Sequence, residues 1–152
     1  MNKVTTISIV IPARNEAAGL RDLLPRLVVL VPGAEIIVVN DGSDDDTPAV
    51  CKASAVKILQ HPYPKGNGAA IKTGARAAKG DVIIFMDADG QHKPEDITAL
   101  VNKFNEGYDM VVGARQSGSQ AGLHRAVAND VFSRFASWMV MQPIADLTSG
   151  FR

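Results

Sequence analysis

The sequence predicts a three-layer α/β/α fold, in which helices cover both faces of a mostly parallel β-sheet. Four short segments are nearly all apolar and rich in β-branched residues, as strands buried on both faces are: 6–11, 35–40, 81–86 and 110–112. Apolar residues at helical spacing occur between these segments. Strands that alternate with helices form right-handed βαβ units, which place the strands parallel in one sheet.

The length and charge of the chain narrow its class. With 152 residues it fits one domain, residues 1–152. Its 16 basic and 16 acidic residues give a formal net charge of zero, so we expect no nucleic-acid partner. The single cysteine, Cys51, excludes an intrachain disulfide. Apolar runs stay well below the roughly 20 residues of a membrane-spanning helix, so we expect any membrane contact to be peripheral or to come from a part of the protein outside this chain.

The first two helices are indicated by apolar spacing and by residues typical of helix starts. Leucines and a valine three or four positions apart predict the first helix: Leu20, Leu23, Leu24, Leu27 and Val31. Asn15 is expected to cap it, and Pro25 is placed to kink it. Thr47 followed by Pro48 predicts the cap and first residue of the second helix.

Three later helices complete the pattern. Residues 69–78 are mostly small, which favours a helix packed closely on the sheet. Pro94 is expected to open a helix that ends near Gly107. Its apolar face is formed by Ile97, Leu100, Val101 and Phe104. A last helix is expected over residues 123–141.

The segments that follow the strands are the candidate site, because ligands of such sheets bind at the carboxyl ends of the strands. All four segments are polar or contain glycine: 12–16, 41–46, 87–92 and 113–115. Chemistry-bearing residues are therefore expected to gather at one edge of the sheet.

The most specific motif is the Asp-x-Asp pair formed by Asp87 and Asp89. Carboxylates two residues apart at a strand end can point the same way into a crevice, and such oxygen ligands suit Mg²⁺ or Mn²⁺ shared with a diphosphate. The alternative is an ordinary turn with a helix cap. A calcium EF-hand is disfavoured, because its sixth and twelfth positions would be His92 and Thr98.

Two further motifs flank other strands. Asp41 is placed to accept hydrogen bonds from a nucleobase N–H or a ribose hydroxyl, whereas residues 44–46 suit helix capping better. The glycine-rich segment 65–70 fails the dinucleotide fingerprint, since Ile71 occupies the third small position. A tight turn into a close-packed helix is favoured there, and Lys65 could face a phosphate.

The histidines and hydroxyl residues give no support for other catalytic chemistry. The three histidines lack metal-ligand spacing, so each is expected on the surface or in a polar network: His61, His92 and His124. A Ser-His-Asp or Cys-His arrangement is not evident, which disfavours nucleophilic catalysis.

Taken in order, four strings resemble the family 2 glycosyltransferases with the GT-A fold: 8–16, 40–43, 87–89 and 146–152. The closing Asp-x-Thr-Ser-Gly-Phe-Arg string is similar to the branch that acts on polyprenyl phosphates, such as the dolichyl-phosphate mannosyltransferases. The resemblance implies a nucleotide-diphospho-sugar transferase fold. Because that family continues past the last string, it also implies a catalytic core truncated at its C-terminus.

The resemblance assigns roles to individual residues. Nucleotide-sugar binding falls to Pro12, Arg14, Glu16, Val39, Asp41, Asp87, Ala88, Asp89 and Gln91. Lys65 joins this binding set from the glycine-rich segment, as the residue that could face a phosphate. Asp87, Asp89 and Gln91 are the implied metal ligands. Arg115 and Arg125 resemble the pair that meets the acceptor phosphate, a task that suits fork-shaped guanidinium donors. Asp146 could orient the acceptor or line the sugar pocket, and the alternative for it is capping or pairing with an arginine. The expected catalytic set is Asp89, Arg115, Arg125 and Asp146.

The implied reaction moves a hexose, with inversion, from a nucleotide-diphosphate sugar to a polyprenyl phosphate such as dolichyl or undecaprenyl phosphate. GDP-mannose, UDP-glucose and UDP-N-acetylglucosamine all remain candidate donors, and the cofactor is Mg²⁺ or Mn²⁺. An acceptor phosphate has a second pKa near ~6 and is already ionised at neutral pH. It needs positioning rather than a strong base. The implied location is the cytoplasmic face of a membrane.

Two other functions remain open. The chain could be a nucleotide-sugar-binding module without turnover, since such a module would share the donor site. An apolar strand followed by Asp-x-Asp-Gly also resembles the haloacid dehalogenase phosphatases, in which the first Asp is the nucleophile. That family has Thr or Val where this chain has Gln91, which counts against it.

Overall fold

The computed structural model describes residues 6–113 and 151. Within this part the chain forms a four-stranded sheet in the order β3-β2-β1-β4, with every neighbouring pair parallel. The strands are β1 (Ile7–Ala13), β2 (Glu35–Asn40), β3 (Lys57–Gln60) and β4 (Val82–Phe85). The predicted parallel sheet is therefore confirmed.

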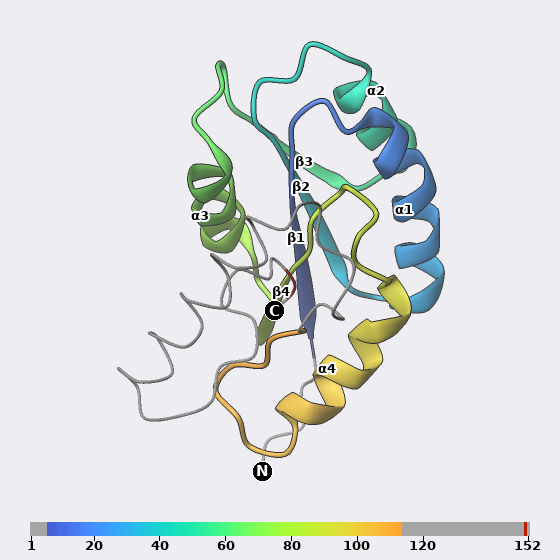
Figure 1. The fold of residues 1–152 in the computed structure, drawn as a ribbon, viewed down its shortest axis with the longest axis vertical. Helices are drawn as coiled ribbons and strands as arrows, with labels where there is room; N and C mark the ends of the chain where they lie inside the picture. Colours follow the sequence, from blue (N-terminus) through green and yellow to red (C-terminus); the bar gives the residue numbers. More distant parts are fainter. Residues whose placement is uncertain (1–5, 114–150, 152) are drawn as a thin grey trace, which may run out of the picture.

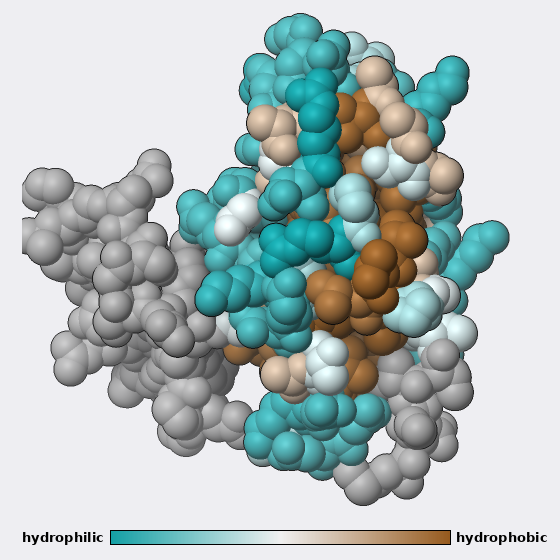
Figure 2. Space-filling model, turned by 90° about the vertical axis from the view of Figure 1, so that its right-hand side faces the viewer, coloured by the Kyte–Doolittle hydropathy of each residue, from teal (hydrophilic) through white to brown (hydrophobic). Residues whose placement is uncertain are grey.

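Helices cover both faces of this sheet (Figure 1), as the three-layer prediction requires. One face carries α3 (Asn67–Ala77), and the other carries α1 (Ala17–Leu30), α2 (Thr47–Ala53) and α4 (Ile97–Phe104). A short 3₁₀ turn, Pro94–Asp96, leads into α4. Figure 2 views the α1 side and shows a band of apolar surface bordered by hydrophilic surface. The last turns of α1 contribute exposed Val28, Val29 and Leu30 to the surface.

Two apolar clusters, one on each face of the sheet, hold the layers together. The larger cluster joins Ile9 and Ile11 of β1 to the buried leucines of α1. The smaller one contains Val10 and Ala70, because successive strand residues point to opposite faces. A Cβ at Gly74 of α3 would overlap Val10, so this helix of small residues packs closely on the sheet, as predicted.

The start of α1 differs from the prediction. Asn15 is not the cap: its φ is 57°, in the left-handed region that Asn tolerates better than most residues, and Glu16 occupies the cap position. The backbone N–H of Asn15 donates to Ser43 Oγ at 2.9 Å, and its side-chain oxygen accepts from Asp44 N–H at 2.9 Å. Asn15 therefore ties the β1–α1 loop to the loop after β2. Pro25 lies inside α1, which continues through it as one helix.

The start of α2 is shifted by one residue. Asp46 occupies the cap position, and Thr47 is the first helical residue. The Thr47 hydroxyl accepts from the backbone N–H of Glu16 at 3.0 Å, so it holds the neighbouring loop rather than capping its own helix.

Two strand predictions were wrong or incomplete. Residues 110–112 form no strand; instead the next residue, Gly113, donates its backbone N–H to the carbonyl of Phe151 at 2.9 Å. Strand β3 was not predicted, because it has only four residues and begins and ends with polar side chains. The helix expected over residues 123–141 lies outside the described residues.

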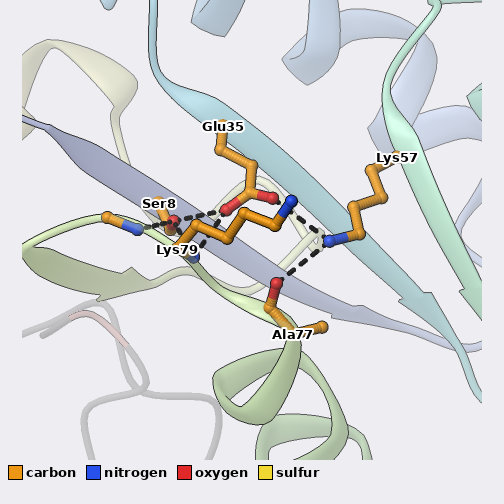
Figure 3. Close-up of polar contacts among 6 residues, drawn as sticks. Ser8, Glu35, Lys57, Ala77 and Lys79 are labelled. Carbon is orange, nitrogen blue, oxygen red and sulfur yellow. Dashed lines mark hydrogen bonds and ion pairs between the residues drawn. The ribbon is translucent and has the colours of Figure 1, made fainter.

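A polar cluster closes the amino ends of the strands on the α3 side (Figure 3). Glu35 Oε2 accepts from Ser8 Oγ at 2.7 Å and from the backbone N–H of Lys79 at 2.9 Å. Its other oxygen accepts from Lys57 Nζ at 3.1 Å, and Lys57 also donates to the carbonyl of Ala77 at 3.0 Å. The Ser8 hydroxyl and these further donors hold the pKa of Glu35 at about 2. The cluster thus joins β1, β2, β3 and the end of α3.

Candidate functional site

A cavity of about 380 Å³ opens at the carboxyl ends of β1, β2 and β4, where the sequence places its candidate residues. Seven of the predicted nucleotide-sugar-binding residues line it: Pro12, Arg14, Glu16, Asp41, Asp87, Ala88 and Asp89. They come from three strand ends that are far apart in the sequence. Their roles in binding stay predictions, but the structure brings them around one cavity.

Asp41 lies at the end of β2 with its side chain 6% exposed. Its Oδ1 accepts from His61 Nδ1 at 2.6 Å and from the backbone N–H of Lys65 at 2.8 Å. Its Oδ2 accepts from the backbone N–H of Gly66 at 2.8 Å. Burial raises the pKa of Asp41, but the hydrogen bonds from His61, Lys65 and Gly66 outweigh it, so the pKa is lower than usual. Asp41 is therefore a carboxylate at neutral pH.

The loop between β3 and α3 is fixed against Asp41 and its neighbour. Gly42 has a φ of 65°, and a Cβ there would lie 2.8 Å from the backbone nitrogen of Pro64. The two loops are therefore in direct contact, and Gly is needed at this position both for the conformation and for the space. His61 is buried, and its Nε2 lies 2.9 Å from Thr73 Oγ1 on α3.

Carboxylates gather at the opposite wall of the cavity. The pKa of Glu16 is raised, first by burial and then by the negative charges of Asp89, Asp45 and Asp87. Like charges that raise a pKa in this way lower the electrostatic potential of the space between them. This wall of the cavity therefore favours a cation.

The loop after β4 is held in place by a hydrogen bond to His92 and by stacking of the His92 ring on Phe151. The backbone N–H of Asp87 donates to His92 Nδ1 at 3.2 Å, and the His92 ring stacks on Phe151 with centroids 5.2 Å apart. Both rings are buried. Asp89 Oδ1 accepts from the backbone N–H of Gln91 at 3.0 Å, which tightens the turn. His61 and His92 thus both lie in polar networks, as expected.

Three predicted binding residues lie near the cavity without lining it. Val39 is fully buried beneath it and pairs with Pro12 in the sheet. The Lys65 ammonium lies 5.4 Å from the centre of the Tyr63 ring, and its backbone rather than its side chain contacts Asp41. Gln91 is exposed. The predicted residues Arg115, Arg125 and Asp146 lie outside the described residues.

Four lining residues were not predicted to bind: Ala13, Gly66, Asn67 and Ala70. Three of them belong to the start of α3 and the residue before it. The glycine-rich segment was the available signal, but a tight turn was favoured for it. The segment does form a turn, in which the backbone N–H of Ala69 and that of Ala70 donate to the carbonyl of Gly66. This turn also forms one wall of the cavity.

The donor set fits a small divalent cation that is shared with a ligand. Within residues 6–113 and 151, there is no group of three or more His, Cys, Asp or Glu side chains that could hold a metal unaided. Asp87 and Asp89 nevertheless line the same cavity as Glu16, whose pKa is raised first by burial and then by the charges of Asp89, Asp45 and Asp87. Mg²⁺ in proteins often takes one or two carboxylates and completes its shell with substrate phosphates.

Comparisons with known proteins agree with this geometry. The family model "Glycosyl transferase family 2" matches residues 8–148. An undecaprenyl-phosphate 4-deoxy-4-formamido-L-arabinose transferase of Shewanella sediminis is 37% identical over 131 residues, covering 78% of this chain and 39% of the relative. A dolichol-phosphate mannosyltransferase of Pyrococcus furiosus is 36% identical over 115 residues, covering 72% and 33%. The chain therefore spans less than half the length of these curated relatives.

Solved structures share the fold. Glucosyl-3-phosphoglycerate synthase from Mycobacterium tuberculosis, in complex with Mn²⁺, UDP and glucosyl-3-phosphoglycerate, superposes with a TM-score of 0.76 at 27% identity. The match covers 96% of this chain and 55% of that chain. The same synthase in complex with Mn²⁺ and UDP-glucose gives a TM-score of 0.75 at 27% identity, covering 96% and 54%.

Proposed function

Because the chain belongs to glycosyl transferase family 2 and has the GT-A fold, we propose that it transfers a hexose, with inversion, from a nucleotide-diphosphate sugar to a polyprenyl phosphate. The observation that carries this proposal is the cavity at the strand ends. An ionised Asp41 lies on one side of it, and a surplus of carboxylate charge lies on the other.

The two walls suit the two halves of a nucleotide-sugar donor. Asp41, Pro12 and Arg14 line the same cavity and would meet the nucleoside. Asp87 and Asp89 would hold Mg²⁺ or Mn²⁺, which offsets the negative charge of a leaving diphosphate. The complex of the mycobacterial synthase with Mn²⁺ and UDP supports this assignment.

The acceptor is proposed from the names of the relatives and from chemistry. Both curated relatives are named for transfer to a polyprenyl phosphate, undecaprenyl or dolichol phosphate. A phosphate oxygen would attack the anomeric carbon while the bond from that carbon to the nucleoside diphosphate breaks, and a single displacement inverts the centre. The ionised phosphate needs no strong base, so Arg115 and Arg125 would position it and Asp146 would orient it.

A lipid acceptor implies work at a membrane surface. Among the described helices none has the length and apolar character needed to cross a bilayer. We propose peripheral contact at the cytoplasmic face, where nucleotide sugars and the lipid phosphate meet.

The decisive experiment measures donor binding and transfer separately. Calorimetry with Mn²⁺ and UDP-glucose, UDP-N-acetylglucosamine or GDP-mannose is expected to show metal-dependent binding. Transfer to undecaprenyl phosphate is then followed with a radiolabelled donor, with 3-phosphoglycerate as the competing acceptor.

Each outcome assigns a function. Binding without transfer to either acceptor would indicate a nucleotide-sugar-binding module, and transfer to 3-phosphoglycerate alone would overturn the lipid assignment. Labelling of Asp87 by beryllium fluoride, without nucleotide binding, would indicate the phosphatase alternative. Arg115→Ala and Arg125→Ala are expected to weaken use of the lipid phosphate while sparing donor affinity.

A further inference from the structure

Asp41 is nearly saturated by hydrogen bonds before any ligand arrives. A carboxylate offers about four acceptor positions, two on each oxygen. Among the described residues, His61 and Lys65 use both positions of Oδ1, and Gly66 uses one position of Oδ2. One position, on Oδ2, is left for a group in the cavity that Asp41 lines.

The number of free acceptor positions on Asp41 distinguishes between the nucleobases of the candidate nucleotide sugars. Guanine presents two adjacent donors, the ring N1–H and the amino N2–H, and a carboxylate matches both only with one free position on each oxygen. The imide edge of uracil presents a single donor, N3–H, between two carbonyl groups. A buried donor without an acceptor costs affinity, so guanine would lose more than uracil against Asp41.

We propose that His61 is a positioning residue that leaves Asp41 with a single acceptor position, and that the site therefore takes a uridine rather than a guanosine diphosphate donor. The inference rests on the proposed donor site and names its nucleotide. Of the donors considered above, it retains UDP-glucose and UDP-N-acetylglucosamine and disfavours GDP-mannose.

The geometry of His61 explains how it can act through Asp41. An ionised carboxylate only accepts, so His61 Nδ1 must donate to Asp41 across the 2.6 Å contact. In the neutral ring, Nε2 then accepts from the Thr73 hydroxyl at 2.9 Å. The ring is 7% exposed, so it is fixed between β2 and α3. Thr73 on α3 thus helps to orient the His61 ring, whose Nδ1 donates to Asp41 Oδ1.

The first test compares UDP with GDP on the unmodified chain by calorimetry in the presence of Mn²⁺. UDP is expected to bind at least about tenfold more tightly, the effect of one charge-assisted hydrogen bond. Equal or tighter binding of GDP would overturn the inference while leaving the proposed function intact. If neither nucleotide bound, the proposed function itself would fail.

The second test separates positioning from mere support of the fold. In His61→Asn the amide nitrogen replaces Nδ1 and keeps the donor to Asp41. In His61→Gln the amide reaches the place of Nε2, so the contact with Thr73 remains and the donor to Asp41 is lost. We expect the UDP preference to persist in H61N and to shrink several-fold in H61Q.

The measured quantity is the ratio of the two affinities, which loss of folded protein does not change. Thermal unfolding of both variants checks that they fold. Equal ratios in the unmodified chain and both variants would show that His61 supports the fold without setting the preference.

Discussion

The two ends of the parallel sheet each hold a glutamate, and their pKa values move in opposite directions. At the amino ends, hydrogen bonds from the Ser8 hydroxyl, the Lys79 N–H and Lys57 lower the pKa of Glu35 to about 2. At the carboxyl ends, burial and the charges of Asp89, Asp45 and Asp87 raise the pKa of Glu16. The charge of Glu35 is satisfied by hydrogen-bond donors within the chain, whereas Glu16 lies among other carboxylates. Glu35 is thus held within the fold at the amino end, and the carboxyl end is where we propose that a cation-bearing ligand binds.

The largest effect is expected at the carboxyl end. Asp89→Ala should lower Mn²⁺-dependent affinity for UDP by about 100-fold, because it removes one of the two cavity-lining carboxylates that we propose hold the ion with the diphosphate. Its free energy of unfolding should change little. Calorimetry with and without Mn²⁺ measures the affinity, and Asp22→Ala, on the exposed surface of α1, is the matched control. Unchanged metal-dependent affinity in D89A would remove Asp89 from the metal site.

The amino end should respond in the opposite manner. Glu35→Gln is expected to lower the free energy of unfolding by about 1–2 kcal/mol, because it weakens charge-assisted hydrogen bonds from three partners. UDP affinity should be unchanged. Urea denaturation provides the measurement.

The control for this change is Glu95→Gln. Glu95 pairs with Arg26 at 2.7 Å on the surface, where its side chain is 51% exposed, and such exposed pairs contribute little to stability. An equal loss of stability in both variants would show that the amino-end cluster is no more than a surface ion pair.

Acid should abolish the contribution of Glu35 specifically. Its pKa is lowered from 4.5 to about 2 on folding, so its stabilising effect is fully present above pH 4.5 and is lost as the pH falls toward 2. The stability difference between the unmodified chain and E35Q should therefore narrow between pH 5 and pH 3. Urea denaturation across this range measures it, and a constant difference would contradict the assignment.

The smallest effect is expected from Glu16→Gln. Because the pKa of Glu16 is raised on folding, its ionised form opposes folding at neutral pH and protonation relieves this as the pH falls. Removing the charge should stabilise the chain at pH 7 by about 0.5 kcal/mol after solvent screening. It should also weaken Mn²⁺-dependent UDP binding a few-fold. A destabilised E16Q variant would mean that Glu16 supports the fold as Glu35 does.

Periodicity and position predicted most of the described fold. Runs of apolar β-branched residues predicted the buried strands β1, β2 and β4. The helical spacing of its leucines predicted α1. Strand β3 was missed because Lys57–Gln60 pairs at the sheet edge and is only half buried. Asn15 was misassigned because its partners, Ser43 and Asp44, belong to another loop.

The candidate site was predictable to the same extent. Acids that directly follow strands could be placed at one edge of the sheet, which located Asp41, Asp87 and Asp89. The wall formed by Gly66 and Asn67 depends on a loop that folds back onto Asp41 from 24 or more residues away. Such a contact leaves no periodic trace in the sequence.

The strand order also has a consequence for how the chain folds. Strand β1 lies inside the sheet, between β2 and β4, and its residue Ile7 pairs with Val82. During synthesis β1 can pair with β2 early, but its other edge can pair with β4 only after β4 has left the ribosome. Contacts between segments so distant in sequence slow folding. Until then one edge of this apolar strand is unpaired, and an unpaired strand edge is prone to aggregation.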